Sequence, residues 1–392
     1  MRKILHIADL HLGFAHRYLD EHAASRAEEA VQTLERVVEW AIDSDHEVGA
    51  VLIAGDLFET HEPDSQLLGR VMATLKRIPT SGRTLVTVPG NHDEYSYPES
   101  VYRQQTRNWP GVLVTSPTFA PVATFELGGH PCTVYSLAFT AGLSGKVLTL
   151  AEEASSPKDG SATRPGAAAS PPGIRIALLH GTLDADPTDR TYRIDSATLA
   201  KGSFSYAALG HIHKPAESRF GDGIALYPGT LNGKGFDDPG TPELVLVSFP
   251  GGRPRIERVP FPTREIRTQK VDLGRYETQE DLVTALERDP APQAIVRLAL
   301  EGFRPEDFDA GELLGRLAGS FHHLEISDRS LEIPAEEIER LEQQPTVKGL
   351  FVQLMRRRIA DAQAVGDQKA VATAQLALEH GLAAFESVRR GH

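Results

Sequence analysis

The decisive stretch of this chain is residues 4–11, Ile-Leu-His-Ile-Ala-Asp-Leu-His. Its apolar half predicts a buried β-strand, and Asp9 and His11 follow where that strand ends. Working outward, helix-like and strand-like segments alternate: a helix over 27–41, a strand at 50–54, a helix over 67–78 closed by Pro79, and a strand at 85–88. This alternation predicts a layered α/β core with a largely parallel sheet.

Further apolar runs extend this first domain over residues 1–262. They predict strands at residues 112–114, 122–125, 133–137, 174–179, 206–209, 224–227 and 244–249. Between them, residues 154–173 are rich in Pro, Gly, Ser and Ala, a composition that predicts a flexible insertion.

The character of the sequence changes near residue 263. Residues 263–333 predict a small α/β domain, with strands at 264–271, 294–300 and 324–327 and helices at 278–288 and 309–318. Residues 334–392 predict a helical tail. Over residues 345–392, seven Lys or Arg stand against four Asp or Glu, which gives a charge of +3 on a chain whose net charge is −13.

Composition bounds the possible functions. The net charge of −13 argues against a protein that coats nucleic acid with a broad basic face, but a nuclease remains possible because divalent cations can meet phosphates. No run approaches the roughly 18 apolar residues that cross a bilayer, and the N-terminus has no signal-peptide pattern, so no membrane partner is expected. The single cysteine, Cys132, excludes an internal disulfide framework and fits a reducing cytoplasm.

Five of the predicted strands end in a polar motif. The motifs are Asp9-Leu10-His11, Gly55-Asp56, Gly90-Asn91-His92-Asp93, His180-Gly181 and Gly210-His211-Ile212-His213. Each motif alone is compatible with a turn, but ligands of open α/β sheets bind at the carboxyl ends of strands, so five such ends predict one shared cleft. Carboxylate, amide and imidazole donors without a thiolate suit Mn²⁺, iron or Zn²⁺. Seven donors exceed what one ion with an open position takes, so we expect two ions, which an aspartate can bridge.

These motifs resemble those of the calcineurin-like metallophosphoesterase superfamily. The finer strings at residues 6–13, 54–58, 206–215 and 227–229 resemble its SbcD-type branch of DNA-repair exonucleases. The resemblance implies a layered α/β metallophosphoesterase sandwich, in which mixed β-sheets are flanked by helices. It also implies that a small α/β capping domain and a helical C-terminal tail follow this sandwich.

Carried over position by position, the resemblance implies two divalent metal ions, usually Mn²⁺. One ion would be held by Asp9, His11, Asp56 and His213, and the other by Asp56, Asn91, His180 and His211. His92 would be the catalytic residue, which stabilises charge on the phosphate or protonates the leaving oxygen.

Two positions depart from the family pattern. Many relatives carry a histidine where this chain has Glu59, and many bacterial relatives carry an arginine near the position of Lys234. Lys234 is therefore a candidate DNA contact with a point charge in place of a phosphate fork, or else a solvated loop lysine. Asp93 either orients His92 or completes a turn.

The expected function is a metal-dependent DNA phosphodiesterase, with exonuclease and endonuclease activity, in double-strand-break repair. An SbcC-like coiled-coil ATPase would dock on the helical tail, the capping domain would shape DNA access, and the family relation implies a homodimer. The tail would alternatively fold back on its own core. A small-molecule phosphoesterase acting on nucleotides or cyclic nucleotides would use the same core, and an assembly protein without catalysis is the third possibility.

Overall fold

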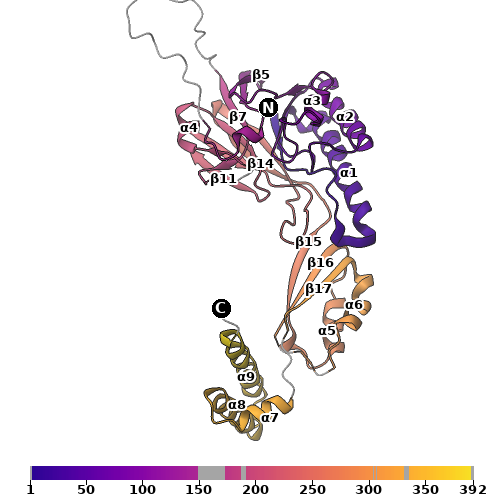
Figure 1. Ribbon diagram of the computed structural model, residues 1–392, viewed down its shortest axis with the longest axis vertical. Helices are drawn as coiled ribbons and strands as arrows, with labels where there is room; N and C mark the ends of the chain where they lie inside the picture. The colour runs from indigo at the N-terminus through magenta and orange to yellow at the C-terminus, as the bar shows by residue number, and fades with distance from the viewer. Residues whose placement is uncertain are drawn as a thin grey trace, which may run out of the picture. The chain divides into compact units, whose positions relative to one another are not determined.

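Strand β1 (Lys3–Ile7) lies inside a six-stranded sheet of the computed structural model, with the order β14-β13-β1-β2-β3-β4 (Figure 1). The other members are β2 (Val48–Ala54), β3 (Thr84–Val88), β4 (Val112–Leu113), β13 (Glu243–Ser248) and β14 (Arg255–Pro260). Strands β1 to β4 are parallel, whereas β13 is antiparallel to both β1 and β14. The expected parallel sheet is thus extended by an antiparallel pair.

A second six-stranded sheet has the order β11-β12-β10-β7-β6-β5. Its members are β5 (Ala120–Leu127), β6 (His130–Ser136), β7 (Ile174–His180), β10 (Tyr206–Gly210), β11 (Ala216–Phe220) and β12 (Gly223–Tyr227). The four inner strands are parallel and the two edge strands are antiparallel to their neighbours. A short parallel pair, β8 (Thr182–Leu183) and β9 (Arg193–Ile194), follows β7.

The helices of this part of the chain lie on the outer faces of the two sheets (Figure 1). They are α1 (Ala23–Ile42), α2 (Ser65–Thr80) and α3 (Val101–Gln105) on one side and α4 (Ser196–Lys201) on the other. The expectation that Pro79 closes a helix was wrong, because α2 continues through it to Thr80. A proline in the last turn removes a single backbone hydrogen bond, so the helix tolerates it there.

Alternation along the strands divides the core into layers. In β1, Leu5 contributes to the core shared with α1 and α2, while Ile4 belongs to the core between the two sheets. In β7, Leu178 lies between the sheets and Leu179 belongs to the core shared with α4. Strands buried on both faces explain why the sequence shows continuous apolar runs here.

The chain divides into two units, Met1–Thr263 and Arg264–His392. The second contains a parallel three-stranded sheet in the order β15-β16-β17, with a capping box of Thr278 and Asp281 at the start of α5. Its elements are β15 (Ile266–Asp272), α5 (Gln279–Glu287), β16 (Ala291–Glu301), α6 (Ala310–Leu317) and β17 (Phe321–Asp328). The helical C-terminal region comprises α7 (Ala335–Glu342), α8 (Val347–Ala364) and α9 (Gln368–Arg389).

The structure describes residues 2–148, 173–186, 191–302, 304–305, 307–330 and 335–389. The insertion predicted at 154–173 therefore lies outside the described residues, except for Gly173. Over the described ranges, none of the helices combines the length and apolar character that a membrane crossing requires. The predicted α/β class, with mixed sheets flanked by helices and a helical C-terminal region, is confirmed.

Candidate metal centre

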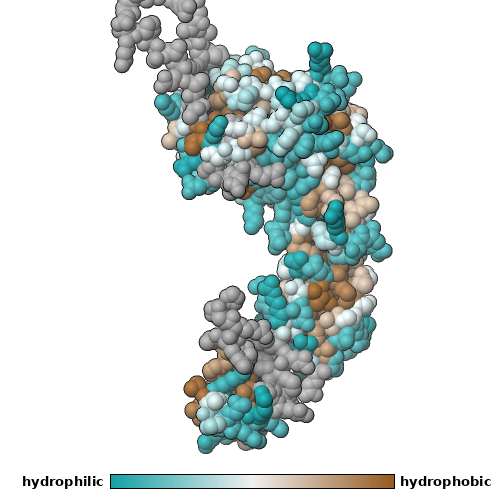
Figure 2. Space-filling model, in the orientation of Figure 1, coloured by the Kyte–Doolittle hydropathy of each residue, from teal (hydrophilic) through white to brown (hydrophobic). Residues whose placement is uncertain are grey.

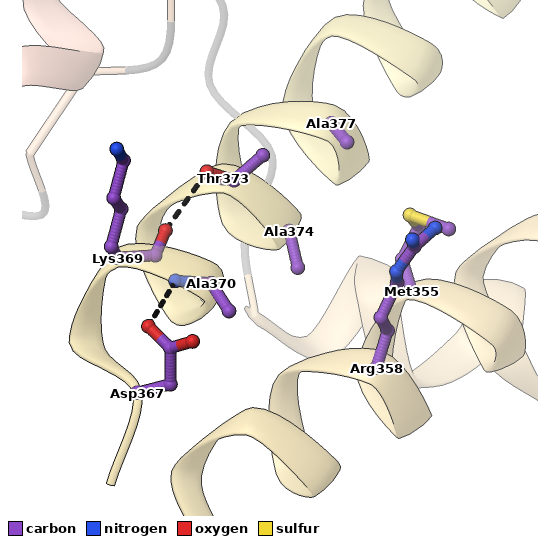
Figure 3. Close-up of a pocket in the computed structure, with 8 residues that line it drawn as sticks. All are labelled: Met355, Arg358, Asp367, Lys369, Ala370, Thr373, Ala374 and Ala377. Carbon is purple, nitrogen blue, oxygen red and sulfur yellow. Dashed lines mark hydrogen bonds between the residues drawn. The ribbon is translucent and has the colours of Figure 1, made fainter.

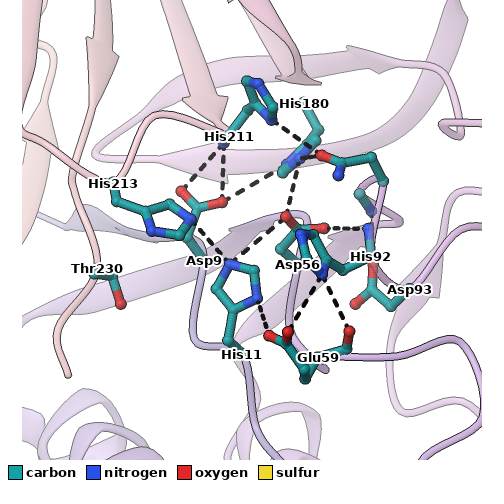
Figure 4. Close-up of polar contacts among 12 residues, drawn as sticks. Asp9, His11, Asp56, Glu59, His92, Asp93, His180, His211, His213 and Thr230 are labelled. Carbon is teal, nitrogen blue, oxygen red and sulfur yellow. Dashed lines mark hydrogen bonds and ion pairs between the residues drawn. The ribbon is translucent and has the colours of Figure 1, made fainter. Parts of the chain in front are cut away.

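The seven predicted donor residues and His92 come together where strands of both sheets end (Figure 4). Asp9 and His11 follow β1, Asp56 follows β2, Asn91 and His92 follow β3, His180 ends β7, and His211 and His213 follow β10. The first sheet thus supplies the carboxylates and the amide, and the second sheet supplies three of the imidazoles.

Asp56 borders two groups of imidazoles. Its Oδ2 lies 3.7 Å from Nε2 of His11 and 3.4 Å from Nε2 of His180. On one side, Nε2 of His11 faces Nε2 of His213 at 2.9 Å. Asp56 therefore lies between His11 and His180, as a ligand shared by two ions would have to.

Asn91 and Asp9 connect the remaining donors. Oδ1 of Asn91 lies 2.9 Å from Nε2 of His180 and 3.0 Å from Nδ1 of His211. The carboxylate of Asp9 accepts from the backbone N–H of His211 at 2.9 and 3.1 Å. Donor atoms lie within 4.8 Å of one another in each of three overlapping groups, which are Asp9 with His11 and His213, His11 with Asp56 and His92, and Asp9 with Asp56 and His180.

Burial makes the charges of this cluster interdependent. Asp9 and Asp56 are only 0% and 1% exposed. Burial raises the pKa of Asp9 above its ordinary value, although His180 opposes the rise. Burial acts in the same direction on Asp56, but His180 and His11 outweigh it and hold the pKa of Asp56 below its ordinary value. Burial would lower the pKa of His180, yet Asp56 and Asp9 raise it to about 9. Two buried carboxylates, Asp9 and Asp56, thus share one cationic partner, His180. Additional positive charge from a bound cation would stabilise both carboxylates.

Strained backbone marks four of the donor positions. Asp9, His11, Asp56 and His211 have φ values of 55°, 46°, 49° and 101°, in the left-handed region that side chains rarely adopt. Such strain persists only where the surrounding structure fixes it, and it concentrates at functional sites. All four residues lie just after β1, β2 or β10, where the chain turns out of the strand.

Glycine is required beside two of the donors. A Cβ added to Gly90 would collide with the side chain of Asp56, and one added to Gly210 would collide with the carbonyl oxygen of Ala54. Gly90 thus allows the loops after β2 and β3 of the first sheet to approach closely, and Gly210 allows β10 of the second sheet to approach β2 of the first.

His92 is held at the rim of the cluster, with 28% of its side chain exposed. Its Nδ1 donates to the backbone carbonyl of Glu59 at 3.1 Å, which leaves Nε2 available. Asp93 does not orient His92. The Asp93 carboxylate accepts from the N–H groups of Gly90 and Phe58 and from the Tyr102 hydroxyl, so it closes the turn and ties two loops together.

Sequence reasoning missed the contacts of two carboxylates with the imidazoles, although it had singled out one of them, Glu59, as a departure from the family pattern. Nδ1 of His11 donates to Oε2 of Glu59 at 2.8 Å, and Nδ1 of His213 donates to Oδ2 of Asp238 at 2.5 Å. Lys234 also donates to Oε2 of Glu59, at 2.8 Å, and its ammonium lies 4.5 Å from the centre of the Phe14 ring. Glu59 and Lys234, the two departures from the family pattern, thus contact each other. No local motif distinguishes Asp238 from the neighbouring Asp237.

The donor set fits divalent cations. Because Glu59 and Asp238 take the Nδ1 protons of His11 and His213, both Nε2 atoms present lone pairs to each other at 2.9 Å. Such a pair is stable only with a proton or a cation between the two nitrogens. Oxygen and imidazole donors without thiolate match Mn²⁺, iron or Zn²⁺.

Relatives with curated names match large parts of the chain. The DNA double-strand break repair protein Mre11 of Aeropyrum pernix is 26% identical over 291 residues, which cover 70% of this chain and 64% of that protein. The Mre11 of Sulfurisphaera tokodaii is 25% identical over 272 residues, which cover 67% of this chain and 64% of that protein. The uncharacterized metallophosphoesterase YhaO of Bacillus subtilis is 24% identical over 322 residues, covering 77% and 72%. The chain thus spans less than two thirds of the length of these two Mre11 relatives.

The family match confirms the resemblance seen in the motifs. Residues 2–215 match the calcineurin-like phosphoesterase family. This range is more than half of the chain, and it contains all seven donor residues and His92. The chain belongs to the calcineurin-like phosphoesterase family.

Proposed function

We propose that this protein is a metal-dependent DNA phosphodiesterase, with exonuclease and endonuclease activity, that acts in double-strand-break repair. The observation that carries the proposal is the convergence of six buried or half-buried donors around a seventh, Asp56, with His92 at the rim. The names of the relatives, DNA double-strand break repair protein Mre11, support DNA as the substrate.

The proposed ligand sets share Asp56. One ion takes Asp9, His11, Asp56 and His213, and the other takes Asp56, Asn91, His180 and His211. The contacts of Asp56 with His11 on one side and His180 on the other support this division. We propose Mn²⁺ as the metal. When bound, the ions would offset the charge of the phosphodiester and act as Lewis acids.

His92 is the proposed catalytic residue. Its Nδ1 proton is committed to the carbonyl of Glu59, so only the imidazolium form carries a proton on Nε2. A protonated Nε2 would stabilise negative charge on the phosphate or donate a proton to the leaving oxygen. The His92 backbone N–H donates to Asp56, which fixes the loop against the donor cluster.

The second unit supplies the proposed accessory parts. Residues 263–333 would form the capping domain, whose own core around β16 includes Val296, Leu298 and Leu300. Residues 334–392 would form the segment that docks a coiled-coil ATPase of the SbcC kind. A substrate as small as a nucleotide needs neither part, so their presence favours DNA over the small-molecule alternative. Lys234 remains a proposed DNA contact, although its ammonium is engaged with Glu59.

The helical tail covers only part of its own apolar surface. Leu341, Val352, Leu378 and Leu382 are buried between its helices. The rings of Phe351 and Phe385 lie 5.8 Å apart, close to Gly381, where an added Cβ would collide with the Phe351 ring. A hollow of about 430 Å³ remains between α8 and α9, bordered by Met355, Arg358 and Lys369 among others (Figure 3).

One face of α8 presents apolar side chains to solvent. Val347, Leu350 and Leu354 are 76%, 57% and 55% exposed, and their spacing of three and four residues places them on one side of the helix. Hydrophobic residues reach the surface of this region in the space-filling view (Figure 2). The exposed Arg357 continues the same face. An apolar stripe that ends in a cation suits a partner helix with acidic residues, as a coiled coil provides.

The proposal includes a cytoplasmic homodimer. Cys132, the one cysteine of the sequence, is buried, which fits a reducing compartment. The dimer rests on the family resemblance.

Paired substrates test the proposed function. Purified protein should hydrolyse linear duplex DNA with Mn²⁺, and Asp56→Asn should abolish this activity. The same preparations would be assayed on cyclic nucleotides. Hydrolysis of the cyclic nucleotide without hydrolysis of DNA would contradict the proposal and favour the small-molecule phosphoesterase.

A further inference from the structure

We propose that the loop at residues 230–240 is a positioning loop for one of the two metal ions, acting through Asp238 and Lys234. The inference rests on the metal site of the proposed function. Asp238 would support His213, and Lys234 would support His11 through Glu59. The ligands of one ion would therefore be held more firmly than the ligands of the other.

Asp238 orients the ring of His213. An ionised carboxylate can only accept, so the 2.5 Å contact engages Nδ1 of His213 as a donor and makes Nε2 the atom that is available to a metal ion. That Nε2 faces His11 across the cluster. The side chains of His213 and Asp238 are 25% and 23% exposed, so water competes only partly for this contact.

Lys234 acts on the opposite imidazole through Glu59. Oε2 of Glu59 accepts from Nδ1 of His11 and from Nζ of Lys234, both at 2.8 Å. The lysine offsets the charge of a carboxylate whose side chain is 22% exposed, and the Phe14 ring lies against the ammonium. His11 is thereby engaged at Nδ1 in the same way as His213, with Nε2 directed at the cluster.

The loop that carries Lys234 and Asp238 is itself anchored. Gly235 and Asp238 exchange backbone hydrogen bonds of 3.2 and 3.1 Å. Arg26 on α1, which is 1% exposed, donates to the carbonyl of Gly233 at 3.3 Å. The Thr33 hydroxyl, also on α1, donates to the side-chain oxygen of Asn232 at 3.2 Å. Helix α1 therefore anchors the start of the loop through Arg26 and Thr33.

Both contacts serve the same proposed ion. His11 and His213 belong to the ligand set that includes Asp9, whereas Nδ1 of His180, in the other set, donates to the backbone carbonyl of Ala54 at 2.8 Å. A carboxylate partner raises the basicity of an imidazole more than a neutral carbonyl does, and loss of such partners typically lowers metal affinity about 10- to 100-fold. Removing the carboxylate of Asp238 or Glu59 should therefore lower the binding affinity for one ion and leave the affinity for the other unchanged.

Calorimetric titration of the full-length, metal-free protein with Mn²⁺, in the absence of DNA, tests the inference. Asp238→Asn and Glu59→Gln should each lower the affinity of one of two sites about 10- to 100-fold, and the double variant should weaken that same site. The matched controls are Asp237→Asn and Glu62→Gln, which change exposed carboxylates one residue from Asp238 and three residues from Glu59. Both controls should titrate like the wild type.

The outcomes separate this inference from the function on which it rests. Two sites in the wild type that are unchanged in Asp238→Asn would overturn the positioning loop alone, as would an equal loss at both sites. A wild type that binds no pair of ions would overturn the metal centre and the loop together. The melting temperature of each metal-free variant is measured in parallel, because a general structural defect would lower it and would weaken both sites.

Discussion

The backbone N–H of His92 donates a hydrogen bond of 2.9 Å to Oδ1 of Asp56. The residue proposed to bridge the two ions therefore also holds the loop of the residue proposed to act on the phosphate. Oδ2 of the same carboxylate faces the imidazoles of His11 and His180. Substitutions at Asp56 must therefore be chosen so that loss of the ligand and release of the loop are told apart.

Comparison of Asp56→Asn with Asp56→Ala separates the loss of the metal ligand from the release of the His92 loop. Asparagine keeps an oxygen that accepts from His92, whereas alanine leaves this partly buried donor without its acceptor, at a cost of up to about 1–3 kcal/mol. We expect both variants to lose both ions, and we expect the metal-free alanine variant to melt at a lower temperature than the asparagine variant. Metal content is measured by mass spectrometry after dialysis. Two ions retained in either variant would remove Asp56 from the bridging position.

His92→Gln should lower hydrolysis about 10²- to 10³-fold while both ions stay bound. The reason is that Nε2 of His92 is the group proposed to meet the phosphate, and its Nδ1 is occupied by the Glu59 carbonyl. Single-turnover rates on DNA and metal content are measured on the same preparation. His22→Gln, which alters a histidine outside the cluster, serves as the control. A drop in metal content would instead make His92 a ligand.

Asp93→Ala should destabilise the metal-free protein by about 3 kcal/mol or more. The substitution removes an acceptor that serves two N–H groups and one hydroxyl, and each buried group left unpaired costs about 1–3 kcal/mol. Urea unfolding gives the free energy of unfolding. Tyr102→Phe removes one of these contacts only and should cost less. A loss of stability no larger than that of Tyr102→Phe would show that the two loops do not depend on Asp93.

His6 should make the stability of the protein depend on pH. It is fully buried beside the Tyr206 hydroxyl, and burial lowers the pKa of His6 from 6.5 to about 3. Within that window the unfolded chain binds a proton that the folded chain excludes. Stability should therefore fall as the pH falls below 6.5, with His6 contributing a slope of about 1.4 kcal/mol per pH unit. Urea unfolding between about pH 4 and 5.5, where the unfolded His6 is almost fully protonated and the folded His6 is not, should give a slope shallower by this amount for His6→Gln. Equal slopes for the two proteins would exclude this role of His6.

Charge placed on the exposed face of α8 should prevent docking without unfolding the tail. The double variant Leu350→Asp, Leu354→Asp should keep the wild-type melting temperature and Mn²⁺-dependent nuclease activity, yet fail to co-purify with a coiled-coil ATPase. Val365→Asp, at a position that is 79% exposed and lies after α8, is the matched control. Leu382→Asp, at a position that is 1% exposed, should instead unfold the tail. Retained co-purification of the double variant would refute docking through this face.

The strand-end motifs made the centre predictable because each motif is local. An apolar run followed by Asp9 or by Asp56 can be read without knowing which strands pair. The supporting carboxylates could not be found in this way, because Asp238 reaches His213 only through the path of a loop that the sequence does not specify. The edge strands β11 and β14 were also missed, since their largely exposed residues, such as Glu217 and Glu257, lack an apolar run.

The tail shows a second limit of pattern reasoning. Leu350, Leu354 and Leu382 are equivalent in a helical pattern, yet two are more than half exposed and the third is buried. Which of them is covered depends on how α8 and α9 meet, and that contact is set by Gly381 and the Phe351 ring. A single glycine among many carries too little information for this to be read from the sequence.

The division of the donors between two sheets has a consequence for the order of assembly. Asp9 and His213 are separated by about half of the chain, and long-range pairings of this kind form late and slowly. Neither sheet alone presents the full donor set, so tight uptake of the ion pair must wait until both sheets have docked. The time course of metal binding during refolding would therefore report the docking of the two sheets, which is the last step. A refolding chain should form its strands before it binds the metal ions.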